Sequence, residues 1–442
     1  QVAKRVVSLL LQERPTEIPN ITAEIKASEQ ALHQQLAPSQ RSAVELCLTH
    51  SISIITGGPG VGKTTTLRVI LDIYHRVMPD NEILLAAPTG KANRRRHEQT
   101  GYPSSTLHSA MGIMYDADLA SQEYELLTAD LVIVDECSMV DIILMYNLLK
   151  AIPERMSLIL VGDTDQLPSV GAGNVLKDLI ASGILPVIRL TRIFRQAQGS
   201  RIIMNAHRIN RGEAIDIRGG KDSDFFFAQK ETNEEIVDTL VRYCTKNLPN
   251  YYHADPFREI QVLTPMQKGI CGAANLNQLL QEAMNPSNLF LRRGGTQYRL
   301  GDKVMQIRNN YDKEVFNGDI GTISKVDMEE QELAVCYDGR DVTYDISELD
   351  ELTLAYAVTI HKSQGSEYPI VVMPFTMSHF VMLQRNLLYT GVTRAKKILV
   401  LIGEKKAVYY AIGNEKTTRR NTKLAEYLAK NKRFEEFPEE SF

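Results

Sequence analysis

The segment Gly57-Gly58-Pro59-Gly60-Val61-Gly62-Lys63-Thr64 constrains the fold of this chain more than any other feature of its sequence. It fits the pattern G-x-x-x-x-G-K-[ST] and stands between an apolar run, Ser51–Thr56, and a helical pattern, Thr65–His75. In this context the glycines let backbone N–H groups turn inward around phosphate oxygens. We therefore expect Gly57 through Thr65 to bind a nucleotide, with Lys63 at its terminal phosphates and the Thr64 hydroxyl on Mg²⁺. A glycine-rich turn that binds nothing would leave the Lys-Thr pair unexplained.

Short apolar runs recur on both sides of the chain's midpoint and predict parallel sheets, because strands buried on both faces have this composition. In the N-terminal half they alternate with helical patterns such as Val140–Lys150, which is βαβα order. We predict an α/β fold with two such domains and a boundary near Ser182–Pro186. The predicted strands, besides Ser51–Thr56, are Ile83–Ala87, Leu131–Val134, Leu158–Val161, Ile260–Thr264, Ile370–Met373 and Ile398–Ile402, with a helix at Ala273–Met284.

Between Gly294 and Asp350 the pattern changes to short alternating strands. The pairs Asn317-Gly318 and Asp338-Gly339 are hairpin signals. We predict a small β-barrel there, inserted into the second α/β domain, with strands at 303–308, 321–326, 332–337 and 341–346. A smaller interruption, Met111–Leu127, falls between two strands of the first domain.

Charge and cysteine content exclude several classes of protein. The 442 residues hold 50 Lys and Arg against 54 Asp and Glu, so a nucleic-acid site must be a local basic surface. The five cysteines are odd in number and lack CxxC spacing, which argues against a zinc knuckle or a disulfide framework. We therefore expect a reducing compartment, the cytoplasm. No apolar run approaches the roughly 20 residues that span a bilayer, so we expect no membrane association.

A second anchor for Mg²⁺ follows the strand Leu131–Val134. Asp135 is predicted to hold the metal, and Glu136 to orient and polarise an attacking water, as phosphoryl transfer requires. The alternative is that this acidic pair caps a following helix. Gln166, after the strand Leu158–Val161, could sense a terminal phosphate or belong to an ordinary polar turn.

Together these segments resemble the RecD-type superfamily 1 DNA helicases, some of which are fused to a conjugative relaxase. The motifs occur in family order over about 37–402. They are Gln40 with its surroundings, the phosphate loop, Ala87-Pro88-Thr89-Gly90-Lys91-Ala92, Asp135-Glu136-Cys137-Ser138-Met139, Gly162-Asp163 with Gln166-Leu167-Pro168-Ser169-Val170-Gly171, Ile193-Phe194-Arg195-Gln196, Thr359 to Glu367, and Tyr389 to Lys396.

The resemblance implies two RecA-like domains with ATP and Mg²⁺ bound between them. It implies an ATP hydrolase that moves 5′→3′ on single-stranded DNA and unwinds duplexes in recombination and repair. The resemblance implies that residues 1–30 are the end of a preceding helical region of a longer chain. It implies a domain 1A at 31–185, with a strand-separating hairpin at about 111–127. Domain 2A would comprise 186–294 and 351–442, and an SH3-like domain 2B would lie between its two parts at 295–350. The implied partners are single-stranded DNA and single-strand/duplex junctions, and we expect a monomer.

The resemblance also implies roles for single residues. Gln40 would read adenine, Glu367 would lie near the ribose, and Arg195 and Arg394 would reach the γ-phosphate. With these two arginines, the implied catalytic set includes Lys63, Glu136 and Gln166. The residues implied to face the DNA backbone are Pro88, Thr89, Lys91, Thr106, His108, Thr359, His361, Lys362 and Ser363.

The chain departs from the family pattern at several positions, of which Ser109 weakens an expected DNA contact. The other departures are Asn93, Cys137 and Gly391-Val392. Cys137 is interpreted as packing filler. The basic run Arg94-Arg95-Arg96 could be a solvated helix face or could bind DNA phosphates. Tyr298 and Tyr311 could stack on bases or pack within the barrel.

Alternative functions stay open at this level. One is an ATP-driven translocase, or a helicase subunit of a larger nuclease or conjugation complex, without autonomous unwinding. Others are an RNA-directed superfamily 1 enzyme and a metabolic P-loop kinase. The sequence contains no nuclease motif that we can identify, so we expect no nuclease activity.

Overall fold

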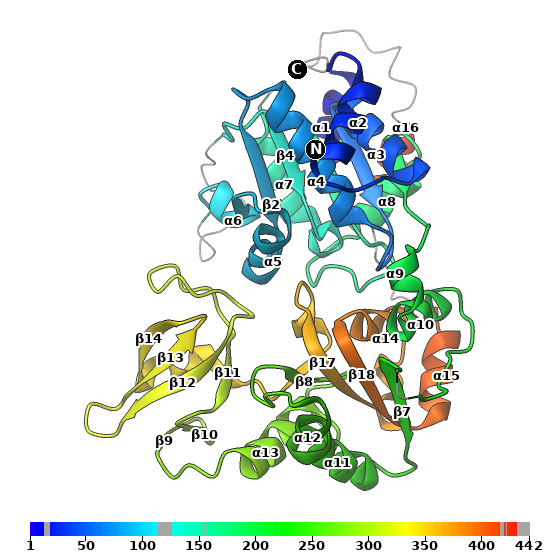
Figure 1. Cartoon of the computed structure of the whole chain (residues 1–442). Coiled ribbons are helices and arrows are strands. Elements are labelled where there is room, and N and C mark those ends of the chain that lie inside the picture. The colour runs from blue at the N-terminus through cyan, green and yellow to red at the C-terminus, as the bar shows by residue number, and fades with distance from the viewer. Residues whose placement is uncertain are drawn as a thin grey trace. The chain divides into compact units, whose positions relative to one another are not determined.

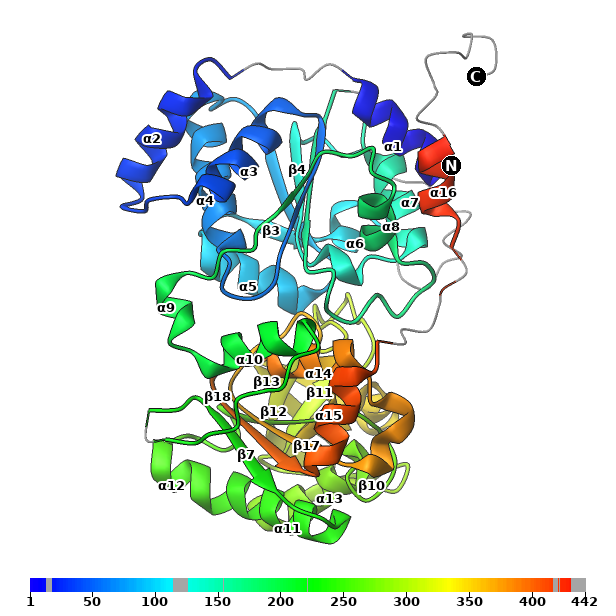
Figure 2. The same cartoon turned by 90° about the vertical axis from the view of Figure 1, so that its right-hand side faces the viewer.

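The computed structural model describes residues 1–12, 18–113, 126–153, 155–220, 222–415, 420 and 422–430, without the side chains of Arg195 and Gln196. The chain forms two compact units, which are described separately below (Figures 1 and 2). The first comprises Gln1–Arg195 and Thr418–Phe442, and the second comprises Gln196–Thr417. In the described part of the chain, no helix is both long enough and apolar enough to cross a bilayer.

The first unit is built on a six-stranded parallel sheet in the order β3-β2-β4-β5-β1-β6. The four strands predicted here from apolar runs are confirmed as β1, β2, β4 and β5. The strand bounds are β1 Ile52–Thr56, β2 Ile83–Ala87, β3 Ser104–Thr106, β4 Leu131–Val134, β5 Ser157–Gly162 and β6 Val187–Arg189.

Helices cover both faces of this sheet because side chains of a strand alternate between its faces. Ile54 of β1 packs among residues of α1, α7, α8 and α16, whereas Ile55 packs among residues of α2, α3 and α4. The helix bounds are α1 Val2–Leu11, α2 Ile21–Ala31, α3 Pro38–Thr49, α4 Lys63–Val77, α5 Gly90–Thr100, α6 Leu107–Ala110, η1 Cys137–Met139, α7 Ile142–Ala151, α8 Val175–Ala181 and α16 Leu424–Lys430.

The limits of the first unit differ from the sequence-based domain 1A, which was predicted to span 31–185. The unit begins at Gln1, and Val6 and Leu9 of α1 belong to its core. Strand β6 pairs with β1, so the expected boundary at 185/186 falls inside this unit, which extends to Arg195. The C-terminal helix α16 also belongs here rather than with domain 2A, since Leu424 and Leu428 are buried in its core (Figure 2). Within the expected hairpin at 111–127, residues 114–125 lie outside the described part.

The second unit contains a five-stranded parallel sheet in the order β16-β8-β17-β18-β7. The three strands predicted for it are confirmed within β8, β17 and β18, and α13 has the predicted bounds. The strands are β7 Phe225–Gln229, β8 Ile260–Thr264, β16 Ala357–Thr359, β17 Tyr368–Phe375 and β18 Ala395–Gly403. The helices are α9 Arg195–Gln198 at the boundary of the units, α10 Arg201–Asn210, α11 Asn233–Arg242, η2 Tyr243–Asn247, α12 Leu248–Tyr252, α13 Ala273–Met284, η4 His361–Ser363, η5 Met377–Met382, α14 Arg385–Val392 and α15 Lys405–Gly413.

The predicted barrel is an antiparallel five-stranded sheet within the second unit, in the order β14-β13-β12-β11-β15. Asp338 and Gly339 both have positive φ, +49° and +88°, and make the tight turn between β13 and β14. Asn317-Gly318 instead lies in a longer connection between β11 and β12. The bounds are β9 Phe290–Arg293, β10 Thr296–Arg299, β11 Lys303–Gln306, β12 Ile320–Asp327, β13 Glu332–Tyr337, β14 Arg340–Asp345, η3 Ile346–Glu351 and β15 Leu352–Leu354.

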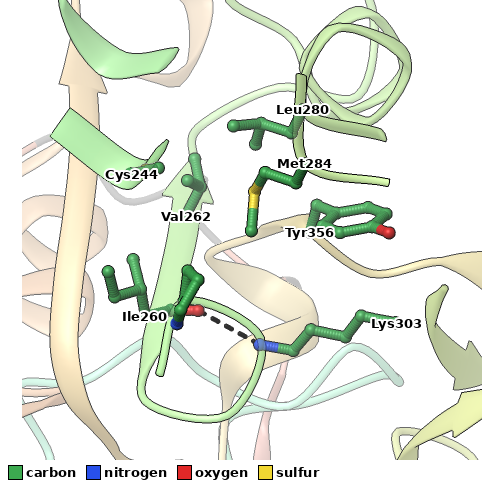
Figure 3. Close-up of a pocket in the computed structure, with 8 residues that line it drawn as sticks. Cys244, Ile260, Val262, Leu280, Met284, Lys303 and Tyr356 are labelled. Carbon is green, nitrogen blue, oxygen red and sulfur yellow. Dashed lines mark hydrogen bonds between the residues drawn. The ribbon is translucent and has the colours of Figure 1, made fainter. Parts of the chain in front are cut away.

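A buried polar cluster around Asp302 joins the barrel to the second sheet and its helices. The Asp302 carboxylate accepts hydrogen bonds from Gln281, Asn285 and Tyr356 at 2.6–2.8 Å. Next to it, the buried Lys303 donates to the Ile260 carbonyl at 3.1 Å, beside a small pocket (Figure 3). That pocket, with a volume of about 10 Å³, has room for about one water molecule, so it is a packing defect rather than a ligand site.

We predict that Asp302→Ala lowers the free energy of unfolding of the second unit by on the order of 3 kcal/mol, because three buried donors lose their acceptor. Chemical denaturation followed by circular dichroism measures this. The control is Asp350→Ala, which removes an exposed ion pair with Arg293 and should cost under about 0.5 kcal/mol. Equal effects of the two substitutions would contradict the structural role of Asp302.

Candidate functional site

The phosphate loop connects β1 to α4 in the conformation that its glycines require. Gly60 and Gly62 have φ of +71° and +82°, a backbone conformation that residues with a Cβ atom rarely adopt. Lys63 Nζ donates to the carbonyls of Gly57 and Gly58, the latter at 3.0 Å. Burial lowers the pKa of Lys63, and the negative charges of Asp163 and Glu136 oppose that shift. The lysine is thus held over the loop, where it can meet a bound phosphate.

Two side chains enclose the loop from outside. Gln40 of α3 donates from Nε2 to the Gly62 carbonyl at 3.2 Å, and its Oε1 accepts from Ala37 N at 2.9 Å. The backbone N–H of Phe194 donates to the Gly60 carbonyl at 3.2 Å. A Cβ on Gly62 would lie 2.4 Å from Gln40 Nε2 and 2.8 Å from Phe194. The sequence did not predict a role for Phe194, although this residue is part of the motif Ile193-Phe194-Arg195-Gln196. The side chain of its neighbour Arg195, which begins α9, lies outside the described part.

The acidic pair lies where β4 ends, one strand from β5 and two from β1. Asp135 is 3% exposed, and Glu136 has φ +50°, which is uncommon for a residue with a side chain. Glu136 occupies the N-cap position of the short helix η1, but its side chain makes no capping hydrogen bond, so the capping alternative is not supported. The next helix, α7, is capped by Asp141, which accepts from Ile143 N and Leu144 N at 3.0 and 2.8 Å. Strained backbone of this kind is concentrated at functional sites.

The adjacent Cys137 is fully buried. Burial raises the pKa of its thiol to about 12. The thiol is therefore protonated at neutral pH, in agreement with its interpretation as packing filler.

The basic run on α5 lies against these acids instead of facing solvent as a whole. Arg96 is 5% exposed; its Nη2 forms an ion pair with Asp135 Oδ2, and its Nη1 donates to Thr64 Oγ1 at 3.1 Å. Arg95 Nη1 lies 3.5 Å from Glu136 Oε1. Of the three arginines only Arg94 is exposed. The solvated-face interpretation is thus wrong for Arg96, which sequence reasoning did not place at this site.

The chemistry of this cluster fits a divalent metal. Thr64 and Asp135 offer a hydroxyl and a carboxylate, the hard oxygen ligands that Mg²⁺ takes together with nucleotide phosphates. The guanidinium of Arg96 is a cation that contacts both groups at once. In the described part of the chain no three His, Cys, Asp or Glu side chains gather as a metal cage.

The end of β5 brings a third carboxylate to the same edge. Asp163 is 2% exposed; its Oδ1 accepts from Asp165 N at 3.0 Å, and its Oδ2 accepts from Gln166 Nε2 at 3.3 Å. Gln166 is therefore oriented by Asp163. Sequence reasoning gave Asp163 no role, although a polar residue directly after a buried strand at this edge was a usable signal.

The expected DNA-facing residues of the first unit lie at the ends of β2, which pairs with β4, and of the edge strand β3, which pairs with β2. Ala87 is in register with Thr106, so Thr89 and Thr106 follow neighbouring strand ends. Both threonines cap helices, accepting from Ala92 N at 3.3 Å and Ser109 N at 3.1 Å respectively. Pro88 and Lys91 flank Thr89 in sequence. His108 lies in the first turn of α6, where burial lowers its pKa.

The expected DNA-facing residues of the second unit gather where β16 ends. Thr359 Oγ1 accepts from Lys362 N at 3.4 Å, and Lys362 is exposed. Burial lowers the pKa of His361, so its ring is neutral at pH 7. Ser363 is fully buried and donates to the Ile360 carbonyl at 2.7 Å, so its hydroxyl shapes the turn.

The expected nucleotide-contacting residues of the second unit lie near one another. Arg394 is 1% exposed, and its guanidinium donates to the carbonyls of Thr390 and Ser366 at 3.2 and 3.1 Å. Glu367 Oε2 lies 3.9 Å from Lys396 Nζ.

On the barrel, Tyr298 is 4% exposed and donates to the Leu352 carbonyl at 2.8 Å, which supports a packing role. Tyr311 is 39% exposed and contacts Phe316 edge to face. Of the two tyrosines, only Tyr311 has a ring surface open to solvent.

Three family models match the chain in order. They are an AAA domain at residues 40–172, the ATP-dependent RecD-like DNA helicase SH3 domain at 276–337 and the UvrD-like helicase C-terminal domain at 354–402. The chain has the domain composition of a RecD-type superfamily 1 helicase. The SH3 match overlaps β9 to β13 and identifies the barrel of this RecD-like chain.

Curated relatives agree with this composition. The ATP-dependent RecD2 DNA helicase of Deinococcus radiodurans is 38% identical over 393 residues, which cover 89% of this chain and 52% of that protein. The RecBCD enzyme subunit RecD of Mycolicibacterium smegmatis is 29% identical over 406 residues, covering 84% of this chain and 72% of that subunit. The RecD-like chain thus spans about half the length of the first relative.

Solved structures share the fold. The Pif1 helicase from Bacteroides in complex with ADP-AlF3 and ssDNA has a TM-score of 0.53 at 18% identity, covering 86% of this chain and 94% of that one. A Pif1 chain from a study of DNA unwinding at forked dsDNA has a TM-score of 0.52 at 20% identity, covering 83% and 92%. The RecD-like chain therefore has two RecA-like domains with an inserted SH3-like barrel, as predicted.

We predict that Gly62→Ala abolishes nucleotide binding, because its methyl group would overlap Gln40 and Phe194 in addition to straining the backbone. Fluorescence titration with a labelled ADP measures the affinity. Gly101→Ala is a matched control, since Gly101 has φ +76° but nothing within 4 Å of the added Cβ. It should lose about 1–2 kcal/mol of stability and keep its affinity. Similar losses of affinity in both variants would contradict close packing around the loop.

Proposed function

We propose that this chain is an ATP- and Mg²⁺-dependent DNA helicase that moves 5′→3′ along single-stranded DNA and unwinds duplexes in recombination and repair. The observation that carries the proposal is the order of strands in the first sheet. Strands β1, β5 and β4 bring the phosphate loop, Asp163 and the Asp135–Glu136 pair to one edge. The next strands, β2 and β3, bring the segments of Thr89 and Thr106 to the same edge. A nucleotide and a DNA backbone bound there would be neighbours.

ATP hydrolysis would use side chains that lie at this edge of the first sheet. Lys63 would neutralise terminal phosphates, Thr64 and Asp135 would hold Mg²⁺, and Glu136 would orient the attacking water, assisted by Gln166. Bound Mg²⁺ would supply charge stabilisation at the phosphates. Gln40 would read the base from its place against the phosphate loop, and Glu367 would lie near the ribose.

Arg195 and Arg394 are proposed to complete the phosphate site from the second RecA-like domain and its boundary. For Arg394 this requires a rearrangement, because its guanidinium is bonded to the Thr390 and Ser366 carbonyls within its own unit. Such a movement would make the arginine available only in one state of the cycle. Differential binding of two states is what converts hydrolysis into translocation.

DNA would be held through its backbone. Hydroxyl, lysine and neutral imidazole groups bond to phosphates without reading sequence, which suits a translocating protein. In the second unit, Thr359, His361 and Lys362 would take this role, and the buried Ser363 would support their turn. The proposed partners are single-stranded DNA and single-strand/duplex junctions. We propose a monomer in the cytoplasm, where five free cysteines are compatible with a reducing environment.

The alternative is a translocase, or a subunit of a larger nuclease or conjugation complex, that does not separate strands alone. It remains a candidate because the chain covers only 52% of the Deinococcus relative. Deletion of 111–127, a segment largely outside the described residues, discriminates the two. Loss of unwinding with retention of DNA-stimulated ATPase would favour that segment as the strand separator.

We predict that Lys63→Ala abolishes DNA-stimulated ATP hydrolysis while DNA binding falls by less than about threefold, because the lysine contacts the phosphate loop and not the DNA-facing segments. Phosphate release and fluorescence anisotropy of a dT oligonucleotide measure the two quantities. Lys4→Ala, at an exposed lysine of the same unit, is the control and should be fully active. Hydrolysis by the Lys63 variant would mean that the loop is misinterpreted.

The proposed activity and polarity are tested together by duplexes with either a 5′ or a 3′ single-stranded overhang. We expect strand separation of the 5′-tailed substrate with ATP and Mg²⁺, and at least tenfold less with the 3′ tail. Measuring the ATPase rate with poly-U and with poly-dT distinguishes an RNA-directed from a DNA-directed enzyme. Equal unwinding from either tail would refute the 5′→3′ assignment, and hydrolysis without any nucleic-acid stimulation would favour a metabolic kinase.

A further inference from the structure

Helix α5 carries an arginine in a position that its packing reserves for small or apolar residues. Its buried residues are Ala92, Arg96 and Thr100, which recur every four residues and so lie on one face of the helix. The helix also shields the Arg96 side chain, which is 6% exposed. A charge so removed from water needs a partner of opposite sign. The role of Arg96 therefore depends on which groups its guanidinium contacts.

The partners of Arg96 are two groups that the proposed function assigns to Mg²⁺. One nitrogen of the guanidinium pairs with the Asp135 carboxylate, and the other donates to the Thr64 hydroxyl at 3.1 Å. Asp135 is itself 3% exposed, and a carboxylate buried to this extent is costly unless a cation lies beside it. Arg95 faces Glu136 at 3.5 Å in the same way. One helix therefore supplies counter-ions to both acids.

A guanidinium and a divalent ion cannot occupy the same two oxygens. We propose that Arg96 is a positioning residue that holds Thr64 and Asp135 ready for Mg²⁺ and competes with the metal, so that Mg²⁺–nucleotide binding requires Arg96 to withdraw. The inference rests on the proposed nucleotide site. Its consequence is a higher Mg²⁺ requirement than the two ligands alone would impose.

The withdrawal of Arg96 is linked to the DNA-facing segment by the helix itself. Thr89 caps α5, and Arg96 lies seven residues, or roughly 10 Å, further along the helix axis. An α-helix of this length moves as a unit, so a shift that frees Arg96 also shifts the turn at Thr89 and Lys91. Binding of DNA to that turn and binding of Mg²⁺ at Thr64 then favour the same position of α5. Linkage makes this effect reciprocal.

The test is a Mg²⁺ titration of fluorescent ADP binding to the purified chain, which reads binding without turnover. We expect Arg96→Leu to lower the Mg²⁺ concentration at half-saturation by about tenfold, because the competing cation is gone. Arg96→Lys, which keeps a charge but cannot bridge both oxygens equally, should give an intermediate value. Arg94→Leu removes the same charge from the exposed face of α5 and should leave the midpoint within twofold of the wild type.

An unchanged or raised midpoint in an Arg96→Leu chain that melts like the wild type would overturn the proposal. If that variant fails to fold, hydrogen exchange of the wild-type chain decides. Adding Mg²⁺ to the ADP-bound protein should speed exchange of amides in 95–100, and unchanged rates would refute the withdrawal. Absence of any Mg²⁺-dependent nucleotide binding in the wild type would instead sink the proposed function.

A separate experiment tests the coupling between DNA binding and Mg²⁺ binding. A dT oligonucleotide should lower the Mg²⁺ midpoint of the wild type and should have little further effect on Arg96→Leu. An oligonucleotide effect of the same size in both chains would overturn the coupling through α5.

Discussion

Parallel pairing of β1, β5 and β4 is the constraint on which the rest of the first unit depends. Parallel strands end at a common edge, so the phosphate loop, Asp135 and Asp163 meet although Asp163 follows Gly57 by 106 residues in the sequence. The strands can pair in this way because each is apolar on both faces and is covered by helices on both sides. A shift of one residue in β4 would turn Asp135 away from the loop.

At that edge, the charges of basic and acidic side chains are neutralised by direct contacts with one another and not by surrounding water. Lys63 is held by loop carbonyls and by the field of Asp163 and Glu136, while the arginines of α5 meet the two acids after β4. Nearly buried charges of this kind are costly to separate, so each rearrangement must replace one counter-ion by another. This makes the charge state of the edge sensitive to any cation or anion that arrives with a nucleotide.

Much of this architecture was predictable from sequence because the long strands are continuous apolar runs. The loop, the acidic pair and the barrel strands carried equally clear local signals. Strands β3 and β6 were missed, since each has only three residues and lies at an edge of its sheet, where composition is weakly constrained. The role of Arg96 could not be found because a run of three arginines does not show which one faces inward. That depends on the rotation of α5 about its axis, which is set by tertiary packing.

The return of the C-terminal segment to the first unit was equally invisible, since its contacts are made with residues nearly 250 positions away. Arg420 donates to the carbonyls of Ser169 and Gly173, and Thr422 donates to Asp178. Leu424 and Leu428 then complete the core beneath α1 and α8. On the ribosome, where a chain emerges from its amino end, part of the interior of the first unit must therefore stay uncovered until α16 is synthesised. A nascent chain arrested before α16 would expose that apolar surface to chaperones.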